Sequence, residues 1–245
     1  MPTKLSLLTI PALALSFSLP HNAFAQAASS QVPVLSPGVH TRVLSMGGLA
    51  TGYAIAIPED YSASKAVPLV LALHFGGSPN GAGASVLVGL VRPAFEDLGA
   101  IIVAPDSVRG QWDTPENDRA VNLLLEGVLG SYNIDRKKIV VTGFSMGGAG
   151  TWHFAAKYPE RFSAAIPVAG RPTPSAAGWR MPVFAVHSRD DEVVPIGPAE
   201  ARIAELKKAG VRAEMVVLTG ISHYQTNRFV DGLRKAVPWL KEIWK

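Results

Sequence analysis

The chain has 245 residues, of which 48% are hydrophobic and 17% charged, and its formal net charge is +4. This length and composition fit one globular domain with a sizeable core and are not typical of a disordered chain. Lys and Arg form no basic block along the sequence, so nucleic-acid binding is not predicted. The chain has no cysteine, which excludes disulfides and thiol chemistry.

The first 25 residues have the pattern of an export signal. Lys4 supplies a positive start, an apolar run covers 5–19, and Ala23-Phe24-Ala25 matches a cleavage site. The apolar run is too short to span a bilayer, so no stable membrane anchor is predicted. We expect a signal peptide at 1–25, a polar linker at 26–38 and export to the periplasm or the medium. The alternative is a buried N-terminal helix.

The remaining residues, 39–245, alternate between short apolar runs, typical of strands, and longer amphipathic stretches, typical of helices. Strands are expected, in chain order, at 40–44, 52–57, 67–74, 100–104, 138–142, 162–168, 182–186 and 212–218. Helices are expected at 84–98, from a cap at Asn117 or Asp118 to about 128, at 148–157, from Pro198 to Gly210, and at 226–244.

This alternation predicts an α/β fold with a mostly parallel sheet and helices on both faces. The first two strands flank Gly47-Gly48 and read as an antiparallel hairpin at the N-terminal side. Pro93 and Pro238 are expected to kink or interrupt their helices. The segment 169–181 is short, so no large cap domain is expected over the site.

A Gly-x-Ser-x-Gly motif, Gly143-Phe144-Ser145-Met146-Gly147, lies between a β-branched run and a helical pattern. In this strand–turn–helix context the motif presents a nucleophilic serine on a sharp turn. The turn is crowded, which explains the small residues on both sides, and Gly148 lets the following helix pack closely. We predict Ser145 as a nucleophile; the alternative is an ordinary glycine-rich turn.

A serine nucleophile needs a general base, and in this arrangement the histidine follows the serine and the acid in the chain. Of the six histidines, His187 and His223 lie more than a helix beyond Ser145. His187 ends a buried apolar run, whereas His223 lies in a short loop after the last strand, so His223 is the predicted base. The orienting acid should come from the loop after the preceding strand. The residues alone leave Asp190 and Asp191 open.

Acyl transfer also needs backbone donors for the oxyanion of the tetrahedral intermediate. One predicted donor is the amide of Met146, next to the nucleophile. The other is expected from the loop His74-Phe75-Gly76-Gly77, because glycine lets the backbone approach a ligand closely. The alternative for this loop is a plain tight turn.

Taken together, these stretches resemble the α/β-hydrolase superfamily, in particular small exported carboxylesterases of the phospholipase/carboxylesterase and polyhydroxyalkanoate-depolymerase-like group. The resemblance spans nearly the whole mature chain and is carried, in family order, by Leu73-His74-Phe75-Gly76-Gly77, Gly143-Phe144-Ser145-Met146-Gly147-Gly148, His187-Ser188-Arg189-Asp190-Asp191-Glu192-Val193-Val194-Pro195 and residues 220–224.

The resemblance implies further assignments. The acid-bearing stretch of the family reads His-Gly-x-x-Asp-x-x-Val-Pro, which implies Asp191 as the acid and places Ser188 where a glycine is usual. The oxyanion loop of the family reads His-Gly-x-Gly, which implies Gly76 as the second donor and places Phe75 at the first glycine.

Three aromatic residues, Phe75, Trp112 and Trp179, are weaker candidates for substrate contact, together with Arg171. Their loops are expected to open on the sheet edge that carries Ser145. The alternative is that each is an ordinary rim residue. The histidines are scattered and no dinucleotide fingerprint occurs, so neither a metal nor a cofactor is predicted.

The sequence therefore predicts an exported serine hydrolase that cleaves small-molecule or polymeric carboxylic esters through an acyl-enzyme. Its alternatives are a small serine peptidase, acyl transfer to an alcohol, and a non-catalytic binding protein with the same fold. The identity of the ester and the oligomeric state are not predicted.

Overall fold

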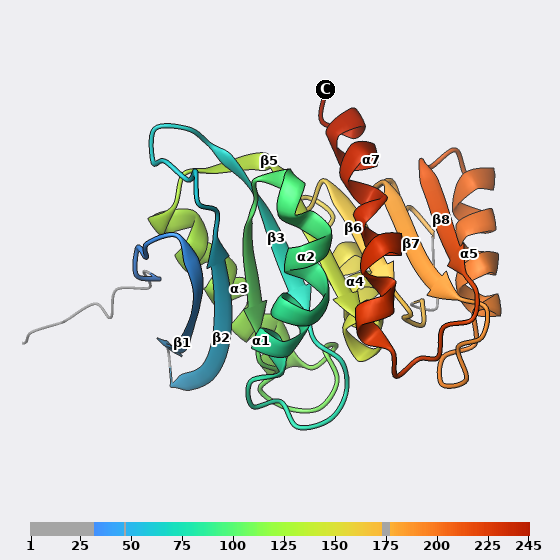
Figure 1. Cartoon of the computed structure of the whole chain (residues 1–245), viewed down its shortest axis with the longest axis horizontal. Coiled ribbons are helices and arrows are strands. Elements are labelled where there is room, and N and C mark those ends of the chain that lie inside the picture. The colour runs from blue at the N-terminus through green and yellow to red at the C-terminus, as the bar shows by residue number, and fades with distance from the viewer. Residues whose placement is uncertain (1–31, 47, 173–176) are drawn as a thin grey trace, which may run out of the picture.

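The structure, a computed structural model, describes residues 32–46, 48–172 and 177–245. The predicted signal peptide at 1–25 lies outside these ranges. The described residues form one sheet of eight strands in the order β1-β2-β4-β3-β5-β6-β7-β8 (Figure 1). The strands are β1 (Gly38–Met46), β2 (Leu49–Ile57), β3 (Val67–Leu73), β4 (Ile101–Pro105), β5 (Ile134–Phe144), β6 (Ala164–Val168), β7 (Val183–Ser188) and β8 (Ala213–Leu218).

The predicted sheet type is confirmed. Strands β3 to β8 run parallel, whereas β1 pairs antiparallel with β2, and β2 pairs antiparallel with β4. Strands β4, β6 and β7 are buried at every position. This is the pattern of strands that are covered on both faces, and it explains their continuous apolar sequences.

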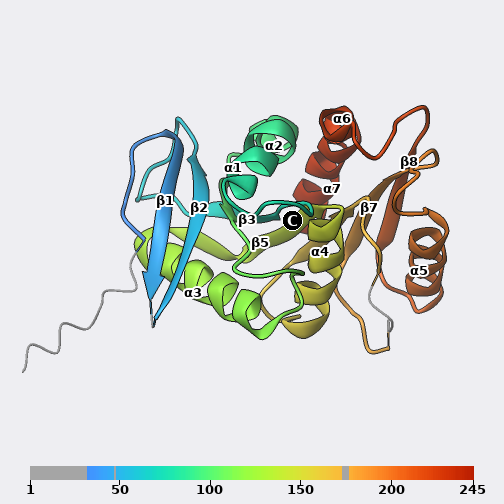
Figure 2. The same ribbon diagram turned by 90° about the horizontal axis from the view of Figure 1, so that it is seen from below.

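Helices cover both faces of the sheet, as Figure 2 shows. They are α1 (Ala82–Val86), η1 (Leu87–Val91), α2 (Arg92–Phe95), η2 (Glu96–Leu98), α3 (Pro115–Ser131), α4 (Met146–Lys157), α5 (Gly197–Lys208), η3 (Thr226–Phe229), α6 (Val230–Arg234) and α7 (Ala236–Ile243). Helices α3, α4 and α5 pack into one hydrophobic core. Helices α1, α2, α6 and α7 pack into the other, across the sheet.

Part of the predicted linker belongs to the folded domain. Val32 is 2% exposed and joins the core. The Pro33 carbonyl accepts a hydrogen bond from the Tyr132 hydroxyl at 2.9 Å, and the Leu35 amide donates to the same hydroxyl oxygen at 3.0 Å. Residues 32–35 therefore pack against the folded domain, within the stretch predicted as a linker.

Helix α3 begins earlier than the sequence predicts. Thr114 is the N-cap, with its side chain accepting from the Asn117 amide, and Pro115 is the first helical residue. Proline is favoured at that position because the first helical N–H has no partner within the helix. The predicted caps, Asn117 and Asp118, are buried instead in the first turn.

Both helices predicted to be kinked or interrupted by proline are divided, and each division falls one to three residues before the proline. The segment before Pro93 is a π-helix, η1, and Pro93 lies in the first turn of α2, where its missing N–H is tolerated. Near the C-terminus the division falls at Lys235, and Pro238 lies in the first turn of α7. Prolines therefore mark these helix starts, with the boundary two or three residues earlier in the second case.

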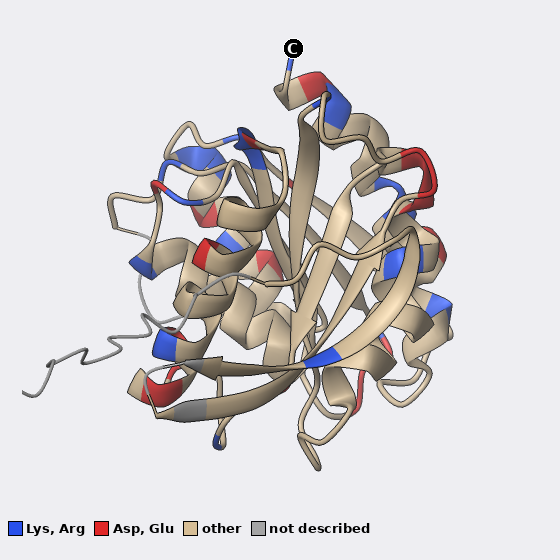
Figure 3. Ribbon diagram, turned by 90° about the vertical axis from the view of Figure 1, so that its left-hand side faces the viewer, with Lys and Arg blue, Asp and Glu red and all other residues tan. Residues whose placement is uncertain are grey.

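Acidic and basic residues are interspersed on the side of the molecule that carries β1 and β2 (Figure 3). Surface ion pairs elsewhere on the molecule include Arg161 with Glu126, and Arg189 with Glu200 of α5. In the described parts of the chain, none of the helices combines the length and apolar character that crossing a bilayer requires.

Candidate active site

Ser145 occupies the sharp turn between β5 and α4, with φ 57° and ψ −114°. A positive φ in a residue other than glycine costs of order 1–3 kcal/mol, so the surroundings must hold it. The Ser145 amide donates to the Val168 carbonyl at 3.0 Å, and the Ser145 carbonyl accepts from the Ala149 amide at 2.9 Å. Gly147 must be glycine, because a Cβ there would overlap the Leu73 carbonyl. The turn is thus fixed from both sides.

The Ser145 hydroxyl faces the His223 ring, with Oγ 2.8 Å from Nε2. On the other side of the ring, Nδ1 lies 2.8 Å from Oδ2 of Asp191. The three residues follow β5, β7 and β8, and the carboxyl ends of these parallel strands meet at one edge of the sheet. His223 is 5% exposed and packs on Phe144. A hydroxyl, an imidazole and a carboxylate therefore form one hydrogen-bonded row.

The structure places the two aspartates differently. The Asp191 side chain is fully buried, and its Oδ1 accepts from the amides of Val193 and Val194 at 3.0 and 2.7 Å. These donors, with the imidazole, offset the loss of hydration of a buried carboxylate. Asp190 instead accepts from the Gly220 amide at 2.6 Å. Of the two, Asp191 contacts the imidazole.

His187, the histidine that the sequence sets aside, lies behind Asp191. It is 2% exposed, and its Nε2 lies 2.8 Å from the Val194 carbonyl oxygen and 3.4 Å from Oδ2 of Asp191. Burial lowers the pKa of His187, although the Val194 carbonyl and Asp191 partly oppose this shift. Its neutral ring braces the acid-bearing loop and does not face the serine.

The loop after β3 is held by His74. Its Nδ1 lies 2.6 Å from the Phe75 carbonyl oxygen, and its Nε2 lies 2.9 Å from the Ser107 amide nitrogen. Because an amide can only donate, Nε2 accepts and Nδ1 carries the hydrogen. Burial lowers the pKa of His74, which favours this neutral form. The Phe75–Gly76 peptide is planar and trans, so fixing its carbonyl also fixes the direction of the Gly76 N–H.

A hollow of about 280 Å³ lies beside Met146, the residue after Ser145, on the α4 side. It is lined by Gln111, Trp112, Asp113, Met146, Ala149, Gly150, His153, Arg171 and Pro172. Trp112 differs from the expected exposed rim residue: it is 1% exposed, and its Nε1 donates to the His74 carbonyl at 2.9 Å. It forms a wall of the hollow and also supports the loop that carries Gly76.

The expectation that Trp179 opens on the edge that carries Ser145 is wrong. Trp179 lies shortly before β7 begins, at the opposite edge of the sheet, where it packs against Trp152 and donates to the Met181 carbonyl at 2.7 Å. Phe75, by contrast, is half-buried beside Gly76 and packs edge-on against Phe144. Residues just before a parallel strand lie at the amino edge of the sheet, opposite the carboxyl edge where Ser145 follows β5.

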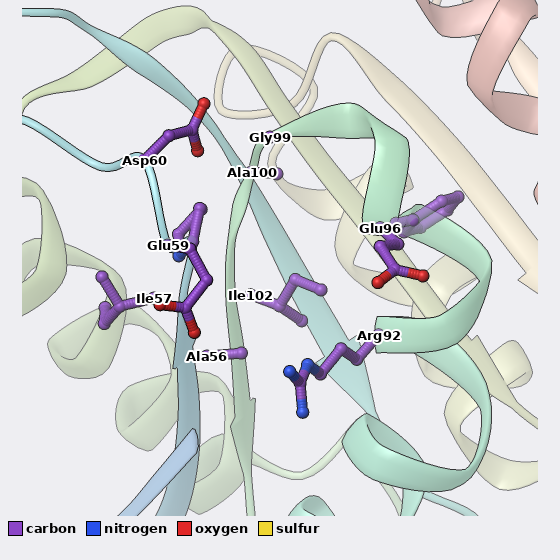
Figure 4. A pocket seen from close by; sticks show the side chains of 11 residues that line it. Ala56, Ile57, Glu59, Asp60, Arg92, Glu96, Gly99, Ala100 and Ile102 are labelled. Carbon is purple, nitrogen blue, oxygen red and sulfur yellow. The ribbon is translucent and has the colours of Figure 1, made fainter. Parts of the chain in front are cut away.

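Another hollow, of about 240 Å³, lies at the amino edge of the parallel strands, away from Ser145 (Figure 4). Buried apolar residues such as Ile102 form its floor, and Glu59, Asp60, Arg92 and Glu96 stand around it. Within the described residues, no group of three or more His, Asp or Glu side chains is arranged to hold a metal ion. This hollow shares no residue with the serine, histidine and aspartate row.

Sequence reasoning missed two residues that contact the His223 loop. The Ser188 hydroxyl donates to the Ile221 carbonyl at 2.6 Å. The Glu192 carboxylate accepts from the Ser222 hydroxyl at 2.5 Å and from the His223 amide at 3.1 Å. The presence of serine in place of the usual glycine at 188 was the one available signal, since a hydroxyl there must find a partner when buried.

Solved structures share this architecture. A structure titled as a thermostable esterase aligns with a TM-score of 0.69 at 23% identity, over 83% of this chain and 62% of the other. A ferulic acid esterase aligns with a TM-score of 0.69 at 18% identity, over 86% of this chain and 100% of the other. The protein is therefore an α/β-hydrolase in fold, as the sequence predicts.

The sequence comparisons narrow this class. The family model for phospholipase/carboxylesterase matches residues 102–239, more than half of the chain. The chain therefore belongs to the phospholipase/carboxylesterase family, and it is a hydrolase of carboxylic esters. An Aquifex aeolicus protein described as a carboxymethylenebutenolidase is 28% identical over 60% of this chain and 78% of its own length. An Aspergillus niger protein described as feruloyl esterase C is 27% identical over 66% of this chain and 61% of its own length.

Proposed function

We propose that Ser145, His223 and Asp191 form the catalytic triad of this ester hydrolase. One observation carries the proposal: the 2.8 Å contacts that join Oγ to Nε2 and Nδ1 to the buried carboxylate. A serine hydroxyl is a weak nucleophile until a base accepts its proton, and the base must hold its hydrogen on Nδ1 to keep Nε2 free. Asp191 accepts that Nδ1 hydrogen and favours this tautomer.

The reaction then proceeds in two halves. Ser145 Oγ attacks the ester carbonyl carbon while its proton passes to His223 Nε2, and the imidazolium returns this proton to the departing alkoxide. The acyl group stays on Oγ. A water molecule, deprotonated by the same nitrogen, then attacks the acyl carbonyl. The imidazolium returns this proton to Ser145 Oγ as the bond from Oγ to the acyl carbon breaks, and the carboxylic acid leaves. Asp191 stabilises the imidazolium in both halves.

The amides of Gly76 and Met146 are the proposed oxyanion donors. Met146 follows the nucleophile directly at the N-terminus of α4, where the first N–H groups have no partner within the helix. Gly76 lies in the loop whose carbonyl orientation His74 fixes. Losing one such donor typically lowers kcat by about 10²–10³.

The substrate is proposed to reach this centre over an open surface, with Phe75 on one side and the hollow beside Met146 on the other. Phe75 is half-buried and supplies an aromatic face next to Gly76. The hollow continues from Met146 to Arg171 and holds the part of the ester that extends over α4. Trp112 contributes only its wall.

Export remains a proposal that rests on the residues of the N-terminal segment. The positive start, apolar run and Ala23-Phe24-Ala25 site support cleavage after Ala25. N-terminal sequencing of protein recovered from the periplasm or medium, with Gln26 as the expected first residue, tests it. A product that retains residue 4 would contradict it.

The experiment that tests the function compares wild-type protein with Ser145→Ala on p-nitrophenyl esters of increasing acyl length. We expect turnover by wild type and less than about 0.1% of its kcat in the variant, in line with the loss of a serine nucleophile. A matched peptide p-nitroanilide tests the peptidase alternative. A variant that keeps several per cent of wild-type kcat would remove Ser145 from the mechanism.

A further inference from the structure

The loops that carry the proposed acid and base are joined by more than the imidazole. Side chains at three alternate positions of the acid-bearing stretch, 188, 190 and 192, all bond to residues 220–223. Ser188 donates to the Ile221 carbonyl, whereas Asp190 accepts from the Gly220 amide. Asp191 lies between Asp190 and Glu192 in the chain, and its carboxylate contacts the His223 ring.

Glu192 makes the contact nearest to the chemistry. Its two carboxylate oxygens are divided between the Ser222 hydroxyl, at 2.5 Å, and the backbone amide of His223, at 3.1 Å. Hydrogen bonds to a charged acceptor are stronger than those between neutral groups. The Ser222 hydroxyl bond is the main cause of the lowered pKa of Glu192, with the His223 amide contributing, so the carboxylate is charged at neutral pH.

The contact to a backbone amide has a specific consequence. The position of the His223 Cα sets where the ring can lie, and the ring must reach Oγ and Oδ2 at 2.8 Å on both sides at once. His223 lies in a loop between β8 and η3, so the parallel sheet does not fix its backbone. Glu192 fixes it from a neighbouring loop that Asp191 already anchors through the Val193 and Val194 amides.

We propose that Glu192 is a positioning residue for the catalytic base: its carboxylate holds the His223 backbone so that the imidazole bridges Ser145 and Asp191. The proposal rests on the proposed triad. It assigns a role to the charged residue directly after the acid, and it predicts that removing its carboxylate lowers the rate of the chemical step and not substrate binding.

The test measures kcat, KM and the rate constant of Ser145 labelling by a fluorophosphonate for Glu192→Ala and Glu192→Gln. Glu192→Ala should lose kcat and the labelling rate constant by about 10- to 100-fold, the range expected when a catalytic group is displaced by about 1 Å. KM should stay within about twofold. Glu192→Gln keeps one acceptor oxygen and should lie between Ala and wild type.

Glu200→Gln is the matched control, because the Glu200 carboxylate pairs with Arg189 on the surface of the same region and not with residues 220–223. It should stay within about twofold of wild type, as expected for an exposed ion pair. Ser222→Ala removes the hydroxyl partner alone and should have a smaller effect than Glu192→Ala. Thermal unfolding of each variant checks that the folded fraction is unchanged.

Two results would overturn the proposal: an unchanged kcat in Glu192→Ala, or a loss that falls on KM instead of kcat. Either result, combined with an inactive Ser145→Ala, would leave the triad in place and remove the role of Glu192 alone. If Ser145→Ala is active, the triad itself fails.

Discussion

Replacing each of the two neighbouring aspartates by asparagine separates their roles in one experiment. In Asp191→Asn, the amide oxygen can still accept from Val193 and Val194, but an NH₂ group then faces Nδ1 of His223. Nδ1 must become the acceptor, so the ring hydrogen moves to Nε2 and points at Ser145 Oγ. The base then cannot accept the serine proton. We expect kcat to fall by about 10⁴-fold, or about 5.5 kcal/mol in the activation barrier.

The matched variant, Asp190→Asn, has the same change of charge one residue away. Its amide oxygen can keep the bond to the Gly220 amide, so the loop stays in place and kcat should fall less than about tenfold. The assay is p-nitrophenyl acetate hydrolysis by purified proteins whose unfolding temperatures agree within a few degrees. A larger loss in Asp190→Asn than in Asp191→Asn would refute the assignment of the acid.

Three further predictions concern the turn, the buried histidines and the hollow. Gly147→Ala should unfold at a markedly lower temperature and lose more than about 2 kcal/mol of unfolding free energy, because the new Cβ overlaps backbone atoms that cannot rotate away. An unfolding temperature equal to that of wild type would contradict this prediction. Burial lowers the folded-state pKa of His74 and His187, so the unfolded chain binds more protons below its usual histidine pKa of about 6.5. The free energy of unfolding should therefore fall as pH drops below about 6.5, and the two histidines should not contribute to its pH dependence above pH 6.5. Calorimetry at pH 7.5 and 5.5 measures this difference. A higher free energy of unfolding at pH 5.5 than at pH 7.5 would contradict the prediction. Arg171→Ala should lower kcat/KM for an ester whose acyl chain ends in a carboxylate by about two- to fivefold relative to an ester with a neutral chain, as expected for an exposed charge beside the hollow. Asp113→Asn should shift this ratio in the opposite direction. A ratio that is the same in both variants would place the substrate elsewhere.

Most of the sheet could be predicted from the sequence because buried parallel strands leave a direct signal. The apolar runs predicted as strands at 67–74 and 182–186 correspond to β3 (Val67–Leu73) and β7 (Val183–Ser188). The first turn of α3 was misplaced because Asn117 and Asp118, the two predicted caps, have the same capping chemistry as Thr114, the observed cap. Only tertiary contacts decide among them: Asn117 bonds to the loop at Val108 and Gln111 instead.

Some residues of the candidate site could likewise be predicted from the sequence, and others could not. Ser145 and His223 could be predicted because chain order and strand–turn–helix context restrict them, and the structure brings the two side chains into contact. Trp179 was assigned to the wrong edge, although it stands just before the strand predicted at 182–186 and therefore at the amino edge of a parallel sheet. The contacts of Glu192 were out of reach because they join loops 30 residues apart, and nothing local at either position records the pairing.

The central claim is that Ser145 carries the acyl group during turnover. The most direct measurement is peptide mass mapping of wild-type protein quenched with acid during hydrolysis of a slowly deacylating p-nitrophenyl ester. We expect an acyl adduct on the peptide that contains Ser145, with fragment ions placing it on that residue, and no adduct in Ser145→Ala. An acyl group found on another residue of the wild-type protein, or one that persists in the Ser145→Ala protein, would contradict it.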